Sequence, residues 1–127
     1  MNTFGKHLIL DIWLQDKITA FTVDSILDLV RSQFTVVAET NHPFEPQGLT
    51  HVCILAESHF TIHTYPEHQY LSMDLYICND GFDLGVFEKT ILALFKINRY
   101  RSETILRGRG AAQRLPDFSE QRVEEWK

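Results

Sequence analysis

The sequence predicts a two-layer α+β sandwich, in which two helices cover one face of an antiparallel β-sheet. Segments that alternate apolar and polar residues occupy the centre of the 127-residue chain, and an amphipathic helical segment lies on each side of them. Only hairpin-length turns separate the central strands, and such short connections require antiparallel pairing. Two helices are too few to cover both faces of a sheet this wide, so we expect them to share one face.

The N-terminal part of the chain predicts a strand followed by a helix. Residues 7–14 alternate well enough for a strand, with leucine and isoleucine on one side. Residues 23–34 carry apolar side chains at helical spacing, and Thr22 stands where an N-cap is expected. The apolar positions of this helix are Val23, Ile26, Leu27, Val30 and Phe34.

The centre of the chain predicts a loop and a series of strands. Residues 35–38 are strand-like, and residues 41–48 contain two prolines and a glycine, which mark an irregular loop. Strands are then expected at residues 50–56, 59–65 and 69–78, with short turns between them.

The C-terminal part predicts a turn, a second helix and a last strand. Residues 79–81 have the composition of a turn, residues 83–97 form an amphipathic helix, and residues 100–106 form a strand. We expect residues 1–110 to form a single domain and residues 111–127 to form a polar tail.

The composition indicates a soluble globular protein. Hydrophobic residues make up 44% of the chain and charged residues 23%, which is typical of a folded domain and not of a disordered one. The formal net charge of −5 disfavours a nucleic-acid partner. No segment reaches the ~18–20 apolar residues that span a bilayer, so no membrane partner is expected. Two cysteines are too few for a disulfide scaffold, which favours the reducing cytoplasm.

The alternation of the central strands assigns several reactive side chains to one face. If Phe60 points to the helices, then His59, Thr61 and His63 point to the uncovered face. By the same alternation Asp74 and Cys78 lie on that face of the next strand. A reactive histidine and a reactive cysteine from neighbouring strands are therefore expected to meet there.

Two other kinds of site are not favoured by the sequence. His59 and His63 would be a ligand pair on a helix, but on a strand they lie ~13 Å apart, so no metal site is expected. Ser58, His63 and Asp74 could form a hydrolase triad, but no Gly-x-Ser-x-Gly motif surrounds Ser58. Taken singly, Ser58 is typical of a turn residue and Cys78 of a small buried residue.

A long motif in the centre of the chain points to a family. Residues 56–67 read Ala-Glu-Ser-His-Phe-Thr-Ile-His-Thr-Tyr-Pro-Glu. This stretch resembles the self-cleavage region of bacterial and archaeal S-adenosylmethionine decarboxylases. Further matches to the family pattern are Gly-Lys-His-Leu at residues 5–8, residues 42–48, and Met-Asp-Leu-Tyr-Ile-Cys at residues 73–78. The resemblance covers roughly residues 1–110.

The resemblance implies a proenzyme that cuts itself between Glu57 and Ser58, giving chains of residues 1–57 and 58–127. The Ser58 hydroxyl would attack the Glu57 carbonyl, and elimination from the resulting ester would convert Ser58 into a pyruvoyl group. That group would form a Schiff base with the substrate amine, so neither pyridoxal phosphate nor a metal is implied. The implied reaction converts S-adenosylmethionine into decarboxylated S-adenosylmethionine (S-adenosylmethioninamine) and carbon dioxide, for polyamine (spermidine) biosynthesis.

The resemblance also assigns roles to individual residues near the pyruvoyl group. It implies that His63 handles a proton during self-processing and that Cys78 donates a proton to the substrate carbon after decarboxylation. Thr50 stands where the family has a serine or threonine hydroxyl near the site, and it is a weaker candidate. Family members commonly assemble as dimers, so a homodimer of cleaved protomers is expected.

Substrate binding is assigned by the same resemblance. Phe44 and Tyr65 match an aromatic pair that encloses the adenine, and Glu67 matches the acidic residue that holds the ribose hydroxyls. Tyr65 replaces the usual tryptophan of the family motif. This replacement leaves open an arginine or ornithine decarboxylase on the same pyruvoyl scaffold. An inactive regulatory paralogue is the alternative from another class, and the presence of serine, histidine and cysteine at the family positions disfavours it.

Overall fold

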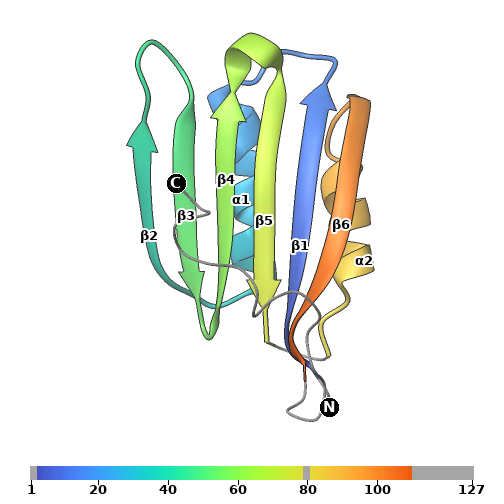
Figure 1. Cartoon of the computed structure of the whole chain (residues 1–127). Coiled ribbons are helices and arrows are strands. Elements are labelled where there is room, and N and C mark those ends of the chain that lie inside the picture. Colours follow the sequence, from blue (N-terminus) through green and yellow to red (C-terminus); the bar gives the residue numbers. More distant parts are fainter. Residues whose placement is uncertain (1–2, 79–80, 110–127) are drawn as a thin grey trace, which may run out of the picture.

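The chain folds into one six-stranded antiparallel sheet with two helices. The computed structural model describes residues 3–78 and 81–109 (Figure 1). The strand order is β2-β3-β4-β5-β1-β6, and every neighbouring pair is antiparallel. In chain order the elements are β1 (Thr3–Leu14), α1 (Ala20–Gln33), β2 (Val36–Pro43), β3 (Leu49–Leu55), β4 (Ser58–Tyr65), the 3-10 turn η1 (Pro66–His68), β5 (Tyr70–Ile77), α2 (Leu84–Leu92) and β6 (Ile97–Arg109).

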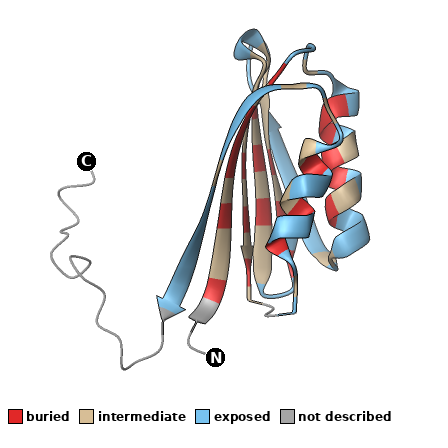
Figure 2. Cartoon of the chain, turned by 90° about the vertical axis from the view of Figure 1, so that its right-hand side faces the viewer, coloured by how far each residue is buried: buried red, intermediate tan, exposed pale blue. Residues whose placement is uncertain are grey.

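Both helices pack on the same face of the sheet, so the predicted two-layer α+β architecture is confirmed (Figures 1 and 2). Figure 2 shows both helices on one side of the sheet, with buried residues alternating with less buried ones along the inner strands. Ile12 of β1, Ile26 of α1, Ile62 of β4 and Ile91 of α2 are each 0% exposed. Each such side chain contributes about 1.5–3 kcal/mol through removal of apolar surface from water. The core therefore joins both helices to the sheet, and no helix or strand of the described residues covers the opposite sheet face.

The predicted alternation of the central strands is also confirmed. In β4, Phe60 is 1% exposed on the helix side, whereas His59, Thr61 and His63 are half-buried on the open face. Antiparallel partners share a face, and Thr61 pairs with Asp74 of β5, which is half-buried as well. The open face thus carries the polar side chains that the sequence assigned to it.

The first helix begins earlier than the apolar spacing predicted. α1 starts at Ala20, and Thr19 is its N-cap in place of the expected Thr22. The Thr19 backbone N–H donates to Thr22 Oγ1 at 3.0 Å, so Thr22 closes the first turn from inside the helix. Phe21 in that turn is 77% exposed and adds nothing to the apolar stripe, which explains why the pattern hid these residues.

Several other boundaries differ from the prediction. β1 begins at Thr3 and not at residue 7, and β2 runs to Pro43, so residues 41–43 of the expected loop at residues 41–48 are strand. β2 is an edge strand, where a proline without an N–H is tolerated. α2 ends at Leu92 and not at residue 97, and β6 is longer than expected because it pairs along most of β1. The predicted tail at residues 111–127, and residues 79–80 of the predicted turn, lie outside the described residues.

A salt bridge joins α1 to the edge strand β2. Arg31 donates from Nη2 to Glu39 Oε1 at 2.7 Å and from Nε to Glu39 Oε2 at 3.1 Å. This hydrogen-bonded cation lowers the pKa of Glu39 from 4.5 to about 2.

The neighbouring cysteine, Cys53 on β3, has a raised pKa. Burial, followed by the charge of Glu39, raises the pKa of Cys53 to about 11, so this side chain is a thiol near neutral pH.

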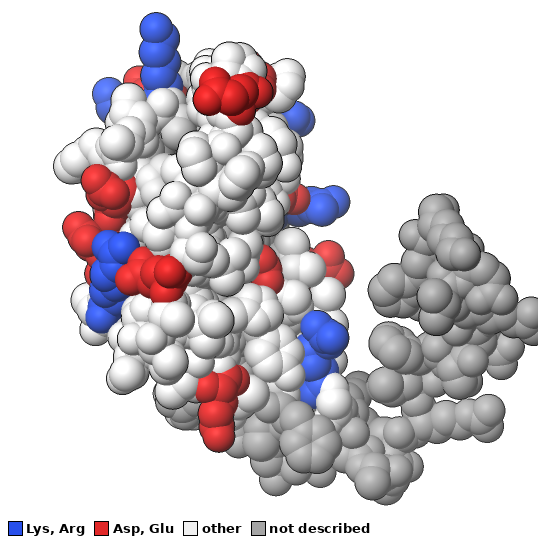
Figure 3. Space-filling model, turned by 90° about the vertical axis from the view of Figure 1, so that its left-hand side faces the viewer, with Lys and Arg blue, Asp and Glu red and all other residues white. Residues whose placement is uncertain are grey.

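Charged side chains are mixed on the face that contains the β2 edge. Basic and acidic groups stand next to one another there and do not gather into a basic patch (Figure 3). Among the described residues, neither helix is long and apolar enough to cross a membrane.

Candidate active site

The turn between β3 and β4 holds the predicted cleavage point in an unusual backbone conformation. Ala56 and Glu57 form the turn, and Glu57 has φ 61°, in the left-handed region. A residue with a Cβ adopts this region at a cost of about 1–2 kcal/mol. The Cys78 thiol, just beyond the end of β5, donates to the Glu57 carbonyl oxygen, with Sγ and O 3.1 Å apart. The carbonyl that precedes Ser58 is thus both strained and hydrogen-bonded.

Ser58 is the first residue of β4 and lies opposite Leu55 of β3. It shares the helix-side parity of Phe60, so it does not belong to the row of polar side chains on the open face. A cavity of about 200 Å³ adjoins Ser58 and is also bordered by Phe34 and Ile77. Glu57, Ser58 and Cys78 form one compact set, which we call the cleavage group.

Thr50 and His63 form a second polar pair, on the open face. They are cross-strand partners in β3 and β4, and Thr50 Oγ1 lies 2.7 Å from His63 Nδ1. A hydrogen bond of this length fixes the orientation of the imidazole ring. The structure therefore brings these two predicted residues together.

The sequence predicted that a reactive histidine and a reactive cysteine meet on the open face, but His63 and Cys78 of one chain lie far apart. His63 is five residues from Ser58 on an extended strand, which separates them by about 16 Å. His63 also pairs with Ser72, six residues before Cys78 along the β5 direction. The histidine next to Ser58 is His59, whose alternating position sends its side chain to the open face.

The three predicted substrate-binding residues lie at the end of the sheet opposite the cleavage turn (Figure 1). Phe44 follows β2 and is 48% exposed, and Tyr65 ends β4 and is 43% exposed. Glu67 lies in the exposed turn η1, directly after Tyr65 and Pro66. Together with Thr50 and His63, these residues form what we call the binding group.

Local contacts hold the binding group in place. The Phe44 N–H donates to the Gly48 carbonyl at 2.8 Å. Gly48 has φ 98°, and a Cβ there would lie 2.8 Å from the Thr64 carbonyl oxygen, so only glycine lets the loop approach β4 this closely. Tyr65 stacks on Tyr70, with ring centroids 5.3 Å apart. Burial, and then a 2.6 Å hydrogen bond to Asp11, raise the pKa of Tyr70.

A third cluster on the open face was not predicted as a unit. Asp74 Oδ2 lies 2.7 Å from His7 Nε2 and 3.0 Å from His59 Nε2, across three neighbouring strands. Arg107 Nη1 lies 3.1 Å from His7 Nδ1, and the Tyr76 ring stacks on His59. Strand alternation had placed His59 and Asp74 on this face, but it gave no sign that His7 and Arg107 join them, because strand order alone brings such distant residues together.

Comparisons with known proteins show which family the chain belongs to. The sequence profile of the S-adenosylmethionine decarboxylase family matches residues 6–108. The chain is 34% identical over 121 residues to the S-adenosylmethionine decarboxylase proenzyme of Oceanobacillus iheyensis, covering 91% of this chain and 96% of that protein. The chain belongs to the S-adenosylmethionine decarboxylase family. Proenzyme 2 of Halalkalibacterium halodurans is 36% identical over 124 residues, covering 89% of this chain and 93% of that one.

A solved structure of the family supports the fold. The adenosylmethionine decarboxylase of Aquifex aeolicus superposes with a TM-score of 0.74 and 25% identity, covering 91% of this chain and 99% of that one. Both the resemblance seen in the sequence and the predicted fold class are therefore confirmed.

Proposed function

We propose that the chain is a self-processing, pyruvoyl-dependent decarboxylase that converts S-adenosylmethionine into decarboxylated S-adenosylmethionine and carbon dioxide, a step towards spermidine. One observation carries the proposal. In this member of the family, Glu57, which precedes Ser58, has a left-handed backbone conformation. Its carbonyl oxygen accepts a hydrogen bond from the Cys78 thiol. A strained and polarised carbonyl beside a hydroxyl is what an intramolecular acyl shift requires.

The bond changes of self-cleavage take place within the cleavage group, and His63 assists by moving a proton. The Ser58 hydroxyl attacks the Glu57 carbonyl carbon, the peptide C–N bond breaks, and the acyl group moves from nitrogen to oxygen. The Cys78 thiol stabilises the negative charge that develops on the carbonyl oxygen, and departure from φ 61° relieves backbone strain. Loss of the Ser58 α-proton expels the Glu57 carboxylate, and hydrolysis of the resulting dehydroalanine releases ammonia. The fit of these residues supports a pyruvoyl group, which supplies an electron sink for decarboxylation.

Cys78 has a second task after the cut. Its sulfur lies 3.1 Å from the carbonyl oxygen of the residue before Ser58, so the thiol borders the position of the new N-terminal group. A thiol at this place delivers a proton to the substrate carbon that loses carbon dioxide. Both cysteines are free, and we place the protein in the cytoplasm, where reducing conditions preserve this thiol.

The binding group suits the substrate. The exposed rings of Phe44 and Tyr65 offer faces for the adenine and for the sulfonium cation, a contact worth about 0.5–2 kcal/mol as it becomes desolvated. Glu67 in η1 offers carboxylate oxygens to the ribose hydroxyls. The Thr50 hydroxyl holds His63 in the orientation needed for proton transfer.

A homodimer completes the site. The cleavage group and the binding group lie at opposite ends of one sheet, too far apart for one chain to use both on the same substrate. The open face also exposes apolar side chains, including Ile54 at 51% and Ile105 at 38%. A second copy related by a two-fold axis, packed on this face, covers these residues and brings His63 of the partner subunit to the end of the sheet that holds the cleavage group.

Release of carbon dioxide tests the proposal and separates it from the alternative. Purified protein is incubated with carboxyl-labelled S-adenosylmethionine, arginine or ornithine, and Ser58→Ala is the control. We expect release from S-adenosylmethionine alone and none with Ser58→Ala. Release from arginine or ornithine but not from S-adenosylmethionine would establish the alternative substrate class. No release from any of the three would favour an inactive paralogue.

A further inference from the structure

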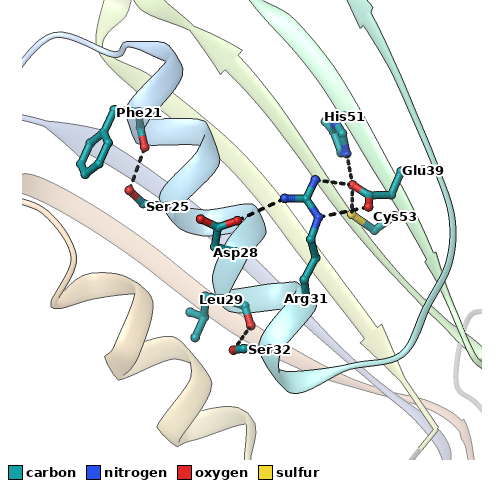
Figure 4. Close-up of polar contacts among 9 residues, drawn as sticks. All are labelled: Phe21, Ser25, Asp28, Leu29, Arg31, Ser32, Glu39, His51 and Cys53. Atoms are coloured by element: carbon teal, nitrogen blue, oxygen red, sulfur yellow. Dashed lines mark hydrogen bonds and ion pairs between the residues drawn. The ribbon is translucent and has the colours of Figure 1, made fainter.

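A cluster of metal-ligating side chains lies on the helix side of the sheet, away from the cleavage and binding groups. His51 Nε2 lies 2.8 Å from Glu39 Oε1, and Cys53 Sγ lies 3.8 Å from the same oxygen. Glu39 comes from β2, and the other two come from the same face of β3. Figure 4 shows the imidazole, the thiol and the Arg31 guanidinium all directed towards the Glu39 carboxylate, and Arg31 Nη2 lies 2.7 Å from the same oxygen, Oε1.

We propose that Glu39, His51 and Cys53 form a binding site for a borderline-soft divalent cation of the Zn²⁺ class. One carboxylate oxygen, one imidazole nitrogen and one sulfur make a donor set that zinc prefers. The three ligand atoms lie within 4.8 Å of one another. Around a tetrahedral zinc, ligand atoms of these kinds are about 3.3–3.6 Å apart, so only small shifts are needed.

Two of the three proposed ligands are buried, which holds them in position for a cation. Cys53 is 0% exposed and His51 is 7% exposed, so strand pairing and core packing fix both ligands before a cation arrives. A cavity of about 360 Å³ between α1 and the β2–β3 edge adjoins His51 and provides a path of entry. It also leaves room for a water molecule in the fourth coordination position.

Arg31 is the group that a cation must displace. Its guanidinium holds both oxygens of Glu39, but its side chain is 42% exposed and so can move. Arg31 Nη1 also lies 3.3 Å from Asp28 Oδ1 on α1, so a displaced guanidinium keeps a carboxylate partner. The cation therefore exchanges with Arg31 at Glu39 without leaving the guanidinium unpaired.

The charges and protons balance when the cation binds. The cation takes a lone pair from each of Glu39 Oε1, His51 Nε2 and Cys53 Sγ, and the thiol proton passes to solvent. Two anionic ligands then face a doubly charged ion. No oxidant or reductant takes part.

Cobalt is the probe, because a thiolate ligand gives Co²⁺ a distinctive near-ultraviolet charge-transfer band. The full chain, cleared of metal by a chelator, is titrated with Co²⁺ and then with Zn²⁺. We expect the band to saturate at one cobalt per chain and to disappear as zinc displaces cobalt. The Asp74 cluster offers no sulfur, so cobalt bound there would give no such band, and Asp74→Asn should leave the band intact.

The two cysteines provide a matched pair of variants. Cys53→Ala should abolish the band, whereas Cys78→Ala should retain it. Arg31→Gln should tighten cobalt binding up to about fivefold, the factor expected from loss of a partly exposed ion pair that competes for Glu39. Glu39→Gln, on an exposed strand and so expected to fold, should weaken binding at least about tenfold.

Three results would overturn the proposal. One is the absence of a thiolate band in the wild-type chain at millimolar cobalt. The second is a band that Cys78→Ala removes. The third is an unchanged cobalt affinity in Glu39→Gln, which decides the matter even if Cys53→Ala fails to fold.

Discussion

Mixed dimers test the separation of Ser58 from His63. The two residues are five positions apart on β4, which places them about 16 Å from each other. Direct proton transfer needs heavy atoms within about 3.2 Å, so His63 cannot serve Ser58 of its own chain. Loss of a general acid or base slows a reaction by about 10²- to 10⁴-fold. His63→Ala homodimers should therefore process at most about one-hundredth as fast as the wild type.

Pairing with a complementary chain should restore the cut. In a dimer of His63→Ala with Ser58→Ala, the first chain keeps its serine and receives His63 of the partner subunit. The two chains carry different affinity tags, mixed dimers are isolated through both tags, and cleavage is followed by intact-mass spectrometry. We expect only the His63→Ala chain to be cut, at a rate near that of the wild type. If that chain stays whole, or if the wild-type chain is a monomer that processes at full speed, the shared site is refuted.

Three further variants address other contacts. Thr50→Val removes the 2.7 Å hydrogen bond to His63 and should slow processing about tenfold, whereas Thr50→Ser should process at the wild-type rate, as followed by intact mass. Gly5→Ala would place a Cβ 2.5 Å from Tyr76 Cζ and should cost about 1–3 kcal/mol in urea unfolding, with part recovered by Tyr76→Leu; an unchanged midpoint would contradict this crowding. Glu39→Gln, compared in chelator, should be less stable than the wild type above pH 4.5, since the pKa of Glu39 is lowered to about 2 on folding; the gap should close as pH falls towards 2, and a gap that widens there would contradict the assignment.

Much of the fold could be predicted because local pattern and tertiary structure agree. The alternation along β5 indicates a strand with helices on one side only. The predicted start of α2 at residue 83 is one residue early, because Asp83 is its N-cap and accepts from the Val86 N–H at 3.1 Å. The end of α2 could not be predicted in this way. Leu94 and Phe95 continue the helical spacing, but the chain turns after Leu92 because β6 pairs along β1. Apolar spacing does not record which partner an element has.

The sequence names candidate site residues but not how they are arranged. The motif at residues 56–67 predicts the cleavage point, and strand rise alone separates Ser58 from His63. The Asp74 cluster depends on strand order, which no local pattern contains. His7 and Asp74 are 67 residues apart and meet only because β1 inserts between β5 and β6.

The intact mass of the purified protein tests the central claim most directly, because one spectrum reports cleavage, the cofactor and the class of protein. The proposed function predicts two fragments, one ending at Glu57 and one that begins with a pyruvoyl group in place of Ser58. Ser58→Ala should give only the 14.8 kDa chain, folded by circular dichroism. A wild-type protein that persists as a single 14.8 kDa chain with an intact serine would contradict the claim.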